Sequence, residues 1–242
     1  SEYIYLPPKT WVYKVREDLT VEETALSEIF VASSIVDRAR MYGSIEARGF
    51  NLGDTVVVQG LGAMGMGMIA KARLLGAGKI IALDYKEKNC KLAEEFGADV
   101  SINLTGLEEK DLIDEIKSMT EGRGADVCVE VVGRPEAVST GLKLLRRGGT
   151  YCETGNFADT GSVPLNIHRQ FAAKNVLFIG NTNHPHDQYY IHHDMMVKHR
   201  KDFPWAKLIT GRFDLDQCEE AMKAAYSPDA LKVEFVPGMN KK

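Results

Sequence analysis

Three closely spaced glycines and one aspartate are the residues of this sequence best suited to chemistry. Gly60, Gly62 and Gly65 follow the β-branched run 55–59, and Asp84 stands nineteen residues after the last of them. In such a pattern the first glycine permits a tight turn, the second lets the backbone approach a diphosphate, and the third lets a helix pack on a strand. A carboxylate at the position of Asp84 accepts hydrogen bonds from ribose hydroxyls. The pattern therefore predicts a dinucleotide-binding site.

The expected position of the diphosphate is the N-terminus of the helix after the glycines, where backbone N–H groups and the helix dipole favour an anion. Asp84 would repel a 2′-phosphate, so NAD is favoured over NADP. Lys86 and Lys88 follow closely and weaken that preference, although a solvated helix start is the simpler interpretation of both.

Alternating strand and helix patterns surround these residues and must position them. The predicted strands cover residues 55–59, 79–83, 100–103, 125–132, 150–154 and 175–179, with helices over 63–75, 86–96, 107–119 and 135–145 between them. The nearly continuous apolar run 125–132 is typical of a central parallel strand, which is covered on both faces. The pattern predicts an α/β fold, a Rossmann-type doubly wound sheet of six parallel strands with helices on both faces.

The two ends of the chain do not fit that sheet. We expect short strands and a loop within residues 1–29, including a strand over 11–13, and a short helix capped by Thr20 with Glu23 as its capping-box partner. Helices near 186–202 and 215–226 and a closing strand over 231–236 complete the chain. The predicted division is therefore 1–29, 30–182 and 183–242.

Composition excludes several classes of function. The net charge is −4 and no long basic run occurs, so nucleic acid is not an expected partner. No apolar stretch approaches membrane-spanning length, and we expect a cytoplasmic protein without membrane association. No pair among the four cysteines has C-x-x-C spacing, and Cys128 and Cys152 are expected as buried free thiols.

Four blocks of the sequence resemble the zinc-dependent medium-chain alcohol and polyol dehydrogenases. The blocks are residues 53–65, 92–99, 124–133 and 144–149, and they occur in that family's order. The resemblance runs from about residue 3 to residue 236. It implies hydride transfer between an alcohol or polyol and NAD, with zinc in the complete protein polarising the alcohol oxygen.

The same resemblance implies that part of the catalytic machinery lies outside this sequence. Members of that family begin with a GroES-like catalytic domain, of which residues 1–29 would be a remnant, and no Gly-His-Glu motif occurs here. We therefore expect a C-terminal fragment or a natural truncation that binds NAD with little or no turnover. Relatives pair through the edge of the sixth strand, so the resemblance also implies a homodimer.

Further cofactor-binding residues follow from the resemblance. They are Leu61, Ala63 and Met64 in the diphosphate turn, Val132 in the ribose pocket, Thr154, Gly155 and Asn156 near nicotinamide, and Asn181 and Asn183 near its carboxamide. Glu28 matches a glutamate that polyol-type relatives place beside zinc. Ile29 replaces the usual proline after it and Ser34 replaces a usual histidine, so a surface role is an equal alternative for Glu28. No catalytic residue is assigned.

Two other functions remain open. One is a zinc-free quinone-reductase relative that uses NADPH, which Asp84 and Glu28 argue against. The other is a non-catalytic dinucleotide-binding module.

Two further features carry separate expectations. The histidines between 184 and 199 are expected to form a solvated or cleft-lining cluster rather than a metal site, because the adjacent His192 and His193 face apart on a helix. Glu130 lies within an apolar strand and must have a partner there, because burying an unpaired charge is costly.

Overall fold

The computed structural model describes residues 3–43, 49–182 and 188–239. It divides into two compact units. The first, which we call the sheet unit, is Ile29–His186, and the second, the terminal unit, combines Ser1–Glu28 with Asp187–Lys242. The assignment of residues 1–29 to a GroES-like remnant stays a prediction.

The sheet unit is built on six parallel strands, as predicted. They are β1 (Thr55–Gln59), β2 (Lys79–Asp84), β3 (Val100–Asn103), β4 (Ala125–Glu130), β5 (Leu145–Glu153) and β6 (Leu177–Gly180), in the order β3-β2-β1-β4-β5-β6. The chain runs outward from β1 to β3, returns to β4 beside β1, and continues to β6. The order therefore reverses between β1 and β4, and in such sheets ligands bind at the carboxyl ends of the two strands that flank this point.

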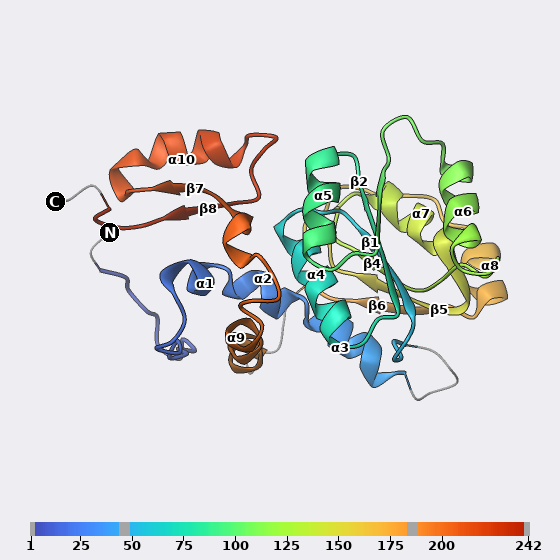
Figure 1. The fold of residues 1–242 in the computed structure, drawn as a ribbon, viewed down its shortest axis with the longest axis horizontal. Helices are drawn as coiled ribbons and strands as arrows, with labels where there is room; N and C mark the ends of the chain where they lie inside the picture. Colours follow the sequence, from blue (N-terminus) through green and yellow to red (C-terminus); the bar gives the residue numbers. More distant parts are fainter. Residues whose placement is uncertain (1–2, 44–48, 183–187, 240–242) are drawn as a thin grey trace. The chain divides into compact units, whose positions relative to one another are not determined.

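Helices cover both faces of the sheet, which confirms the doubly wound fold (Figure 1). On one side lie α4 (Ala63–Leu74) and α5 (Glu87–Glu95), with α3 (Ser34–Met41) packed beside α4. On the other side lie α6 (Glu109–Ser118), α7 (Pro135–Leu144) and α8 (Ile167–Gln170), followed by the 3₁₀ turn η1 (Ala172–Lys174). The core beneath α6 and α7 consists of buried side chains from the strands and both helices, among them Val57, Ile81, Leu112, Ile116, Leu142 and Tyr151.

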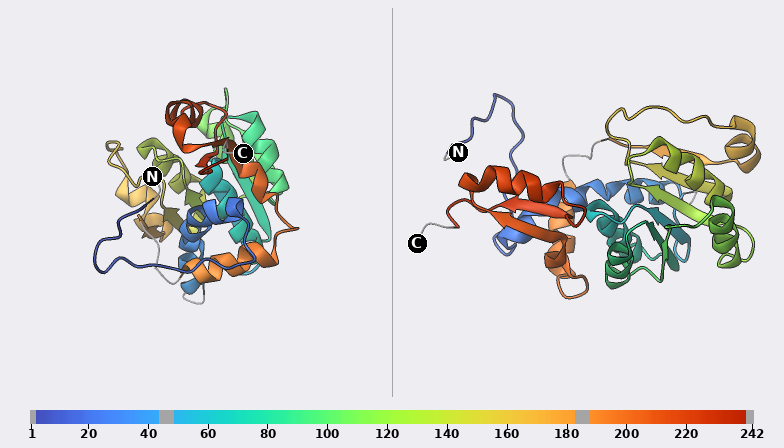
Figure 2. Two further views of the ribbon diagram at one scale, coloured as in Figure 1. Left: turned by 90° about the vertical axis from the view of Figure 1, so that its left-hand side faces the viewer. Right: turned by 90° about the horizontal axis from the view of Figure 1, so that it is seen from above.

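The terminal unit contains a two-stranded parallel sheet of β7 (Ile209–Phe213) and β8 (Lys232–Phe235), on which α10 (Cys218–Ala225) packs (Figure 2). Its other elements are α1 (Val21–Ala25), the start of α2 (Ser27–Ala32), α9 (Gln188–Lys198) and the 3₁₀ turns η2 (Trp205–Leu208) and η3 (Leu215–Gln217). The predicted cap of α1 is confirmed: Thr20 Oγ1 accepts from the Glu23 N–H, and Glu23 Oε2 accepts from the Thr20 N–H. In the three described ranges no helix is both long and apolar enough to cross a bilayer.

Several predicted elements differ from the structure. The strand over residues 11–13 is wrong: Trp11 and Val12 are about 70% exposed, and no described strand pairs with them. Such a segment lacks the neighbour that would satisfy its N–H and C=O groups. The sixth strand begins at Leu177 rather than at 175, because Asn175 ends η1 in the left-handed conformation with φ of 54°. The helices α2 and α3 and the strand β7 were not predicted.

Gly141 of α7 tests how tightly this helix packs on the sheet. A Cβ at this position would overlap Gln59 Oε1 and lie 2.6 Å from the Tyr151 ring. We expect Gly141→Ala to lower the free energy of unfolding, because overpacking costs about 1–3 kcal/mol whereas better helix propensity returns at most about 1 kcal/mol. Chemical denaturation measures the change. The exposed Glu136→Ala in the same helix is the control, and an unchanged or raised stability of Gly141→Ala would contradict this packing.

Candidate functional site

The glycine turn between β1 and α4 opens towards solvent at its centre. Gly60 has φ of 91°, which glycine adopts without strain. A Cβ on Gly65 would overlap the carbonyl oxygen of Gly60, so only glycine lets α4 begin this close to the turn. A Cβ on Gly62 would meet no atom within 4 Å. Gly62 is the N-cap of α4 and supplies no capping side chain, so the positive end of this helix faces open space.

Asp84 lies at the end of β2 and is tied to that turn. Its Oδ2 accepts from the main-chain N–H of Leu61 at 2.7 Å and from Asn89 Nδ2 at 3.2 Å. Its Oδ1 accepts from the Lys86 N–H at 2.8 Å. A carboxylate offers about four acceptor positions, so this partly exposed group retains capacity for a ligand hydroxyl next to the turn.

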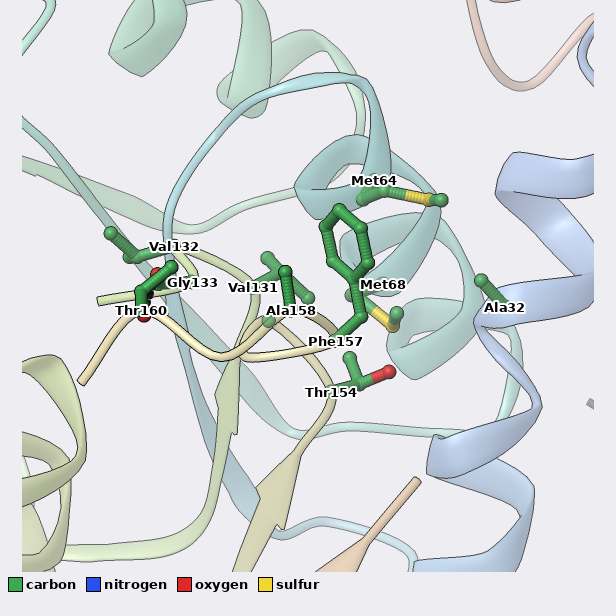
Figure 3. Close-up of a pocket in the computed structure, with 11 residues that line it drawn as sticks. Ala32, Met64, Met68, Val131, Val132, Gly133, Thr154, Phe157, Ala158 and Thr160 are labelled. Carbon is green, nitrogen blue, oxygen red and sulfur yellow. Dashed lines mark hydrogen bonds between the residues drawn. The ribbon is translucent and has the colours of Figure 1, made fainter. Parts of the chain in front are cut away.

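An apolar cavity of about 250 Å³ lies beside the turn, at the carboxyl ends of β4 and β5 (Figure 3). It is lined from α4, from the segments that follow β4 and β5, and from α2: Met64, Met68, Val131, Val132, Gly133, Thr154, Gly155, Phe157, Ala158, Thr160 and Ala32. In Figure 3 the ring of Phe157 lies next to Met64 and Met68. Its volume and its mainly apolar lining suit part of a small ligand rather than a whole one.

This cavity unites four of the residues that the sequence singled out, namely Met64, Val132, Thr154 and Gly155. Sequence reasoning missed the other seven lining residues, namely Ala32, Met68, Val131, Gly133, Phe157, Ala158 and Thr160. Met68 stands one helical turn after Met64, and this spacing is the signal that would have found it. For Ala32 there is no signal, because only the fold brings α2 to the ends of β4 and β5.

The remaining predicted residues do not line the cavity. Asn181 follows β6 and donates its main-chain N–H to the carbonyl oxygen of Glu153 at 2.9 Å. Asn156 follows β5, and its side chain and main-chain N–H both donate to Glu153 Oε1, at 3.0 and 2.9 Å. Asn183 falls outside the described residues.

Glu130 has the partners that its burial requires. Its Oε1 accepts from the N–H groups of Val132 and Gly133, at 2.5 and 2.8 Å, and its Oε2 accepts from Asn156 Nδ2 at 3.3 Å. In the register of β4 and β5 it stands opposite Glu153. Burial first, and the neighbouring Glu153 second, raise the pKa of Glu130 to about 8. At neutral pH Glu130 therefore keeps its proton, while its oxygens hold the segments that follow β4 and β5.

A family model described as zinc-binding dehydrogenase matches residues 63–195, more than half of the chain. The chain belongs to the zinc-binding dehydrogenase family. Its sequence is 38% identical to an erythritol/L-threitol dehydrogenase of Mycolicibacterium smegmatis, over 69% of this chain and 43% of that protein. It is 30% identical to a sorbitol dehydrogenase of Bacillus subtilis, over 94% of this chain and 60% of that protein.

Solved structures of this kind share the fold. An alcohol dehydrogenase from Thermotoga maritima superposes with a TM-score of 0.83 and 29% identity, over 93% of this chain and 60% of that one. A zinc-binding dehydrogenase from Sinorhizobium meliloti, solved with NADP bound to it, has a TM-score of 0.78 and 21% identity, over 93% and 62%. The chain spans about 40–60% of the length of the erythritol/L-threitol and sorbitol dehydrogenases named above.

The described part of this chain contains no set of ligands for the zinc ion that the family's name implies. No group of three or more His, Cys, Asp or Glu side chains there is placed to hold a metal ion. The Glu28 side chain is 63% exposed, and its Oε2 lies 3.4 Å from Lys232 Nζ. An exposed carboxylate beside a lysine does not fit a zinc site by itself. The zinc role of Glu28 stays a prediction, and we derive no chemistry from a metal.

The prediction of a solvated or cleft-lining histidine cluster is wrong for two members. His192 and His193 are 0% and 2% exposed, because α9 packs both into the terminal unit. His192 Nδ1 pairs with the Gln188 carbonyl oxygen at 2.7 Å, and His193 Nε2 with Ser27 Oγ at 2.9 Å. The fold, rather than helix periodicity, decides their burial. His184 and His186 fall outside the described residues.

The raised pKa of Glu130 predicts a loss of stability with rising pH. The folded protein holds this proton up to about pH 8, whereas the unfolded chain releases it near the ordinary value of about 4.3. Its contribution to stability is therefore complete below the unfolded value and is lost as the pH rises towards 8, by at most about 1.4 kcal/mol per pH unit.

Urea unfolding of the native protein and of Glu130→Gln between pH 5 and 9 measures this contribution. We expect the free energy of unfolding of the native protein to fall relative to that of Glu130→Gln between pH 5 and 8. Above pH 8 the difference between the two should be constant. Glu136→Gln, an exposed carboxylate on α7, should show no such change. A difference that is constant from pH 5 to 9 would show that Glu130 is ionised in the folded protein.

Proposed function

We propose that the sheet unit binds a nicotinamide dinucleotide at the carboxyl ends of β1, β2 and β4, with NAD preferred to NADP. One observation carries the proposal: the open, glycine-lined N-terminus of α4 adjoins the carboxylate of Asp84 through the Leu61 hydrogen bond. An anion site next to a hydroxyl acceptor suits a diphosphate and its neighbouring ribose.

The surrounding residues take roles in the same proposal. The backbone of residues 60–65 would hold the diphosphate. The cavity lined by Met64, Val132, Thr154 and Gly155 would take the nicotinamide and its ribose, and Phe157 would cover the ring. Asn181, which is anchored to the end of β5, would contact the carboxamide through its backbone. Asn156 acts indirectly, since it ties the segment after β5 to Glu130 and Glu153.

For the complete protein we propose hydride transfer between an alcohol or polyol and the cofactor. The erythritol/L-threitol and sorbitol dehydrogenases support a polyol, since both are named for such substrates. A bound nicotinamide ring supplies the hydride chemistry, and the residues of the sheet unit position and shield it. Any zinc would take most of its ligands from outside the described residues. Pairing through the β6 edge and a cytoplasmic location also stay predictions.

Replacement of Asp84 tests the cofactor preference. Asp84→Asn keeps an oxygen for the Leu61 N–H but removes the charge that the ribose hydroxyls face. We expect the Kd for NADH to rise about tenfold, which is about 1.4 kcal/mol. The Kd for NADPH should stay equal or fall, because repulsion of the 2′-phosphate disappears. Titration followed by NADH and NADPH fluorescence measures both constants.

The exposed Glu94→Gln on α5 removes the same charge away from the turn and should leave both constants unchanged. Equal affinity of the native protein for NADH and NADPH would contradict a ribose-binding role for Asp84. Stronger binding of NADPH would favour the quinone-reductase alternative.

Turnover separates binding from catalysis. We expect residues 1–242 with NAD, added zinc and a series of alcohols and polyols to bind cofactor while producing no NADH above background. The metal-ligand motif that the family resemblance implies does not occur in this sequence. Absorbance at the NADH band measures the reaction, and robust turnover would contradict this expectation.

A further inference from the structure

A second pocket of about 470 Å³ lies at the opposite edge of the same sheet. Arg123 precedes β4, Leu145 is the first residue of β5, and Lys117 lies in the last turn of α6. Parallel strands all begin at one edge of a sheet and end at the other. This pocket therefore lies at the amino ends of β4 and β5, away from the proposed dinucleotide site at their carboxyl ends. Its lining includes residues of α6, α7 and α8, the helices on one side of the sheet in Figure 1.

The pocket is strongly cationic in a protein of net negative charge. Six of its ten lining residues are basic, namely Lys117, Arg123, Lys143, Arg147, Arg169 and Lys174, and the other four are Ile113, Leu145, Asn166 and Gln170. These six are drawn from 30 lysines and arginines in a chain of net charge −4. None of these lining residues is acidic, so the lining itself offers no carboxylate that would offset these positive charges.

Internal ion pairs neutralise only part of this charge. Lys143 Nζ lies 2.7 Å from Glu109 Oε2, and Arg123 reaches Asp126 at 3.9 Å. Within the described ranges, the other four basic side chains have no carboxylate oxygen within 4 Å. The preference for basic residues near helix C-termini explains those in the last turns of α6, α7 and α8, but not Arg147 near the start of β5.

Lys174 forms the fixed floor of the pocket. Its Nζ donates to the carbonyl oxygens of Leu142, Lys143 and Leu145, at 2.8, 3.1 and 2.7 Å. This places a half-buried ammonium group at the carbonyl oxygens that end α7 and begin β5. Burial, and then repulsion from Lys117, lower its pKa to about 8. Lys117 and Lys174 repel each other, so one anion bound near both would stabilise the charged form of each.

We propose that this pocket binds a small phosphorylated anion at a site separate from the dinucleotide. Guanidinium groups pair with phosphate through two parallel N–H donors, and three arginines line the pocket. Ile113 and Leu145 add apolar surface that an organic part could contact, whereas the Gln170 amide is already bonded to Asn166 and Ser139. A cavity of this volume takes a small molecule rather than a polymer.

Calorimetry with inorganic pyrophosphate as the probe tests the proposal on the full chain. We expect saturable binding to one site that weakens as salt is added. The double variant Arg147→Gln/Arg169→Gln should weaken it at least tenfold. The double variant Lys201→Gln/Lys223→Gln removes the same charge from exposed positions elsewhere and should bind as the native protein does. Thermal unfolding of both variants checks that they are folded.

Repeating the titration with saturating NADH separates this site from the glycine turn. Pyrophosphate binding that persists with NADH supports the basic pocket, whereas its loss would assign the anion to the dinucleotide site. Equal weakening in the two double variants would mean attraction by overall charge only, and would overturn the proposal. So would tighter binding of double-stranded DNA than of pyrophosphate at the same salt concentration. NADH affinity should not change in Arg147→Gln/Arg169→Gln, so failure here leaves the dinucleotide proposal unaffected.

Discussion

The hydrogen bond from the Leu61 N–H to Asp84 Oδ2 is the contact on which the site depends. It joins the turn after β1 to the end of β2, and it fixes the carboxylate beside the start of α4. The conformation of Gly60 and the close approach of Gly65 to it are the conditions for this geometry. A side chain at either glycine would move the first turn of α4 and with it the oriented amides. The charge of Asp84 and the dipole of α4 thus share one small region, and in the proposed function each would recognise a different part of the dinucleotide.

A second group of contacts holds the segments that follow β4 and β5, beside the cavity. Glu130 and Glu153 stand side by side at the ends of β4 and β5, and Asn156 bridges them. Burial, and then the carboxyl group of Glu153 opposite it, raise the pKa of Glu130, so that Glu130 holds a proton at neutral pH. The hydrogen bonds of Glu130, Glu153 and Asn156 hold the segments that follow both strands, and these segments form most of the cavity wall. The stability of the fold and the shape of the cavity therefore depend on the same pair.

Much of the sheet unit could be predicted because local signals and fold agree there. All six strands, the turn glycines and the position of Asp84 at a strand end follow from periodicity, glycine spacing and β-branched runs. The capping box of Thr20 and Glu23 is equally local. The features that could not be predicted depend on distant segments. Ala32 reaches the cavity, His193 is buried against Ser27, and Glu130 meets Glu153 only through tertiary packing.

Perturbation of backbone amide signals by NADH tests the central claim most directly. A ¹H–¹⁵N spectrum recorded during titration with NADH reports each N–H of the turn separately. The account predicts saturable shifts at Leu61, Gly62, Ala63 and Met64 and at the end of β2, together with smaller shifts at residues 131–133 and 154–156. The amides of β7, β8 and α10 should not move. Saturable binding that leaves residues 60–65 unshifted would contradict the account, as would the absence of any binding.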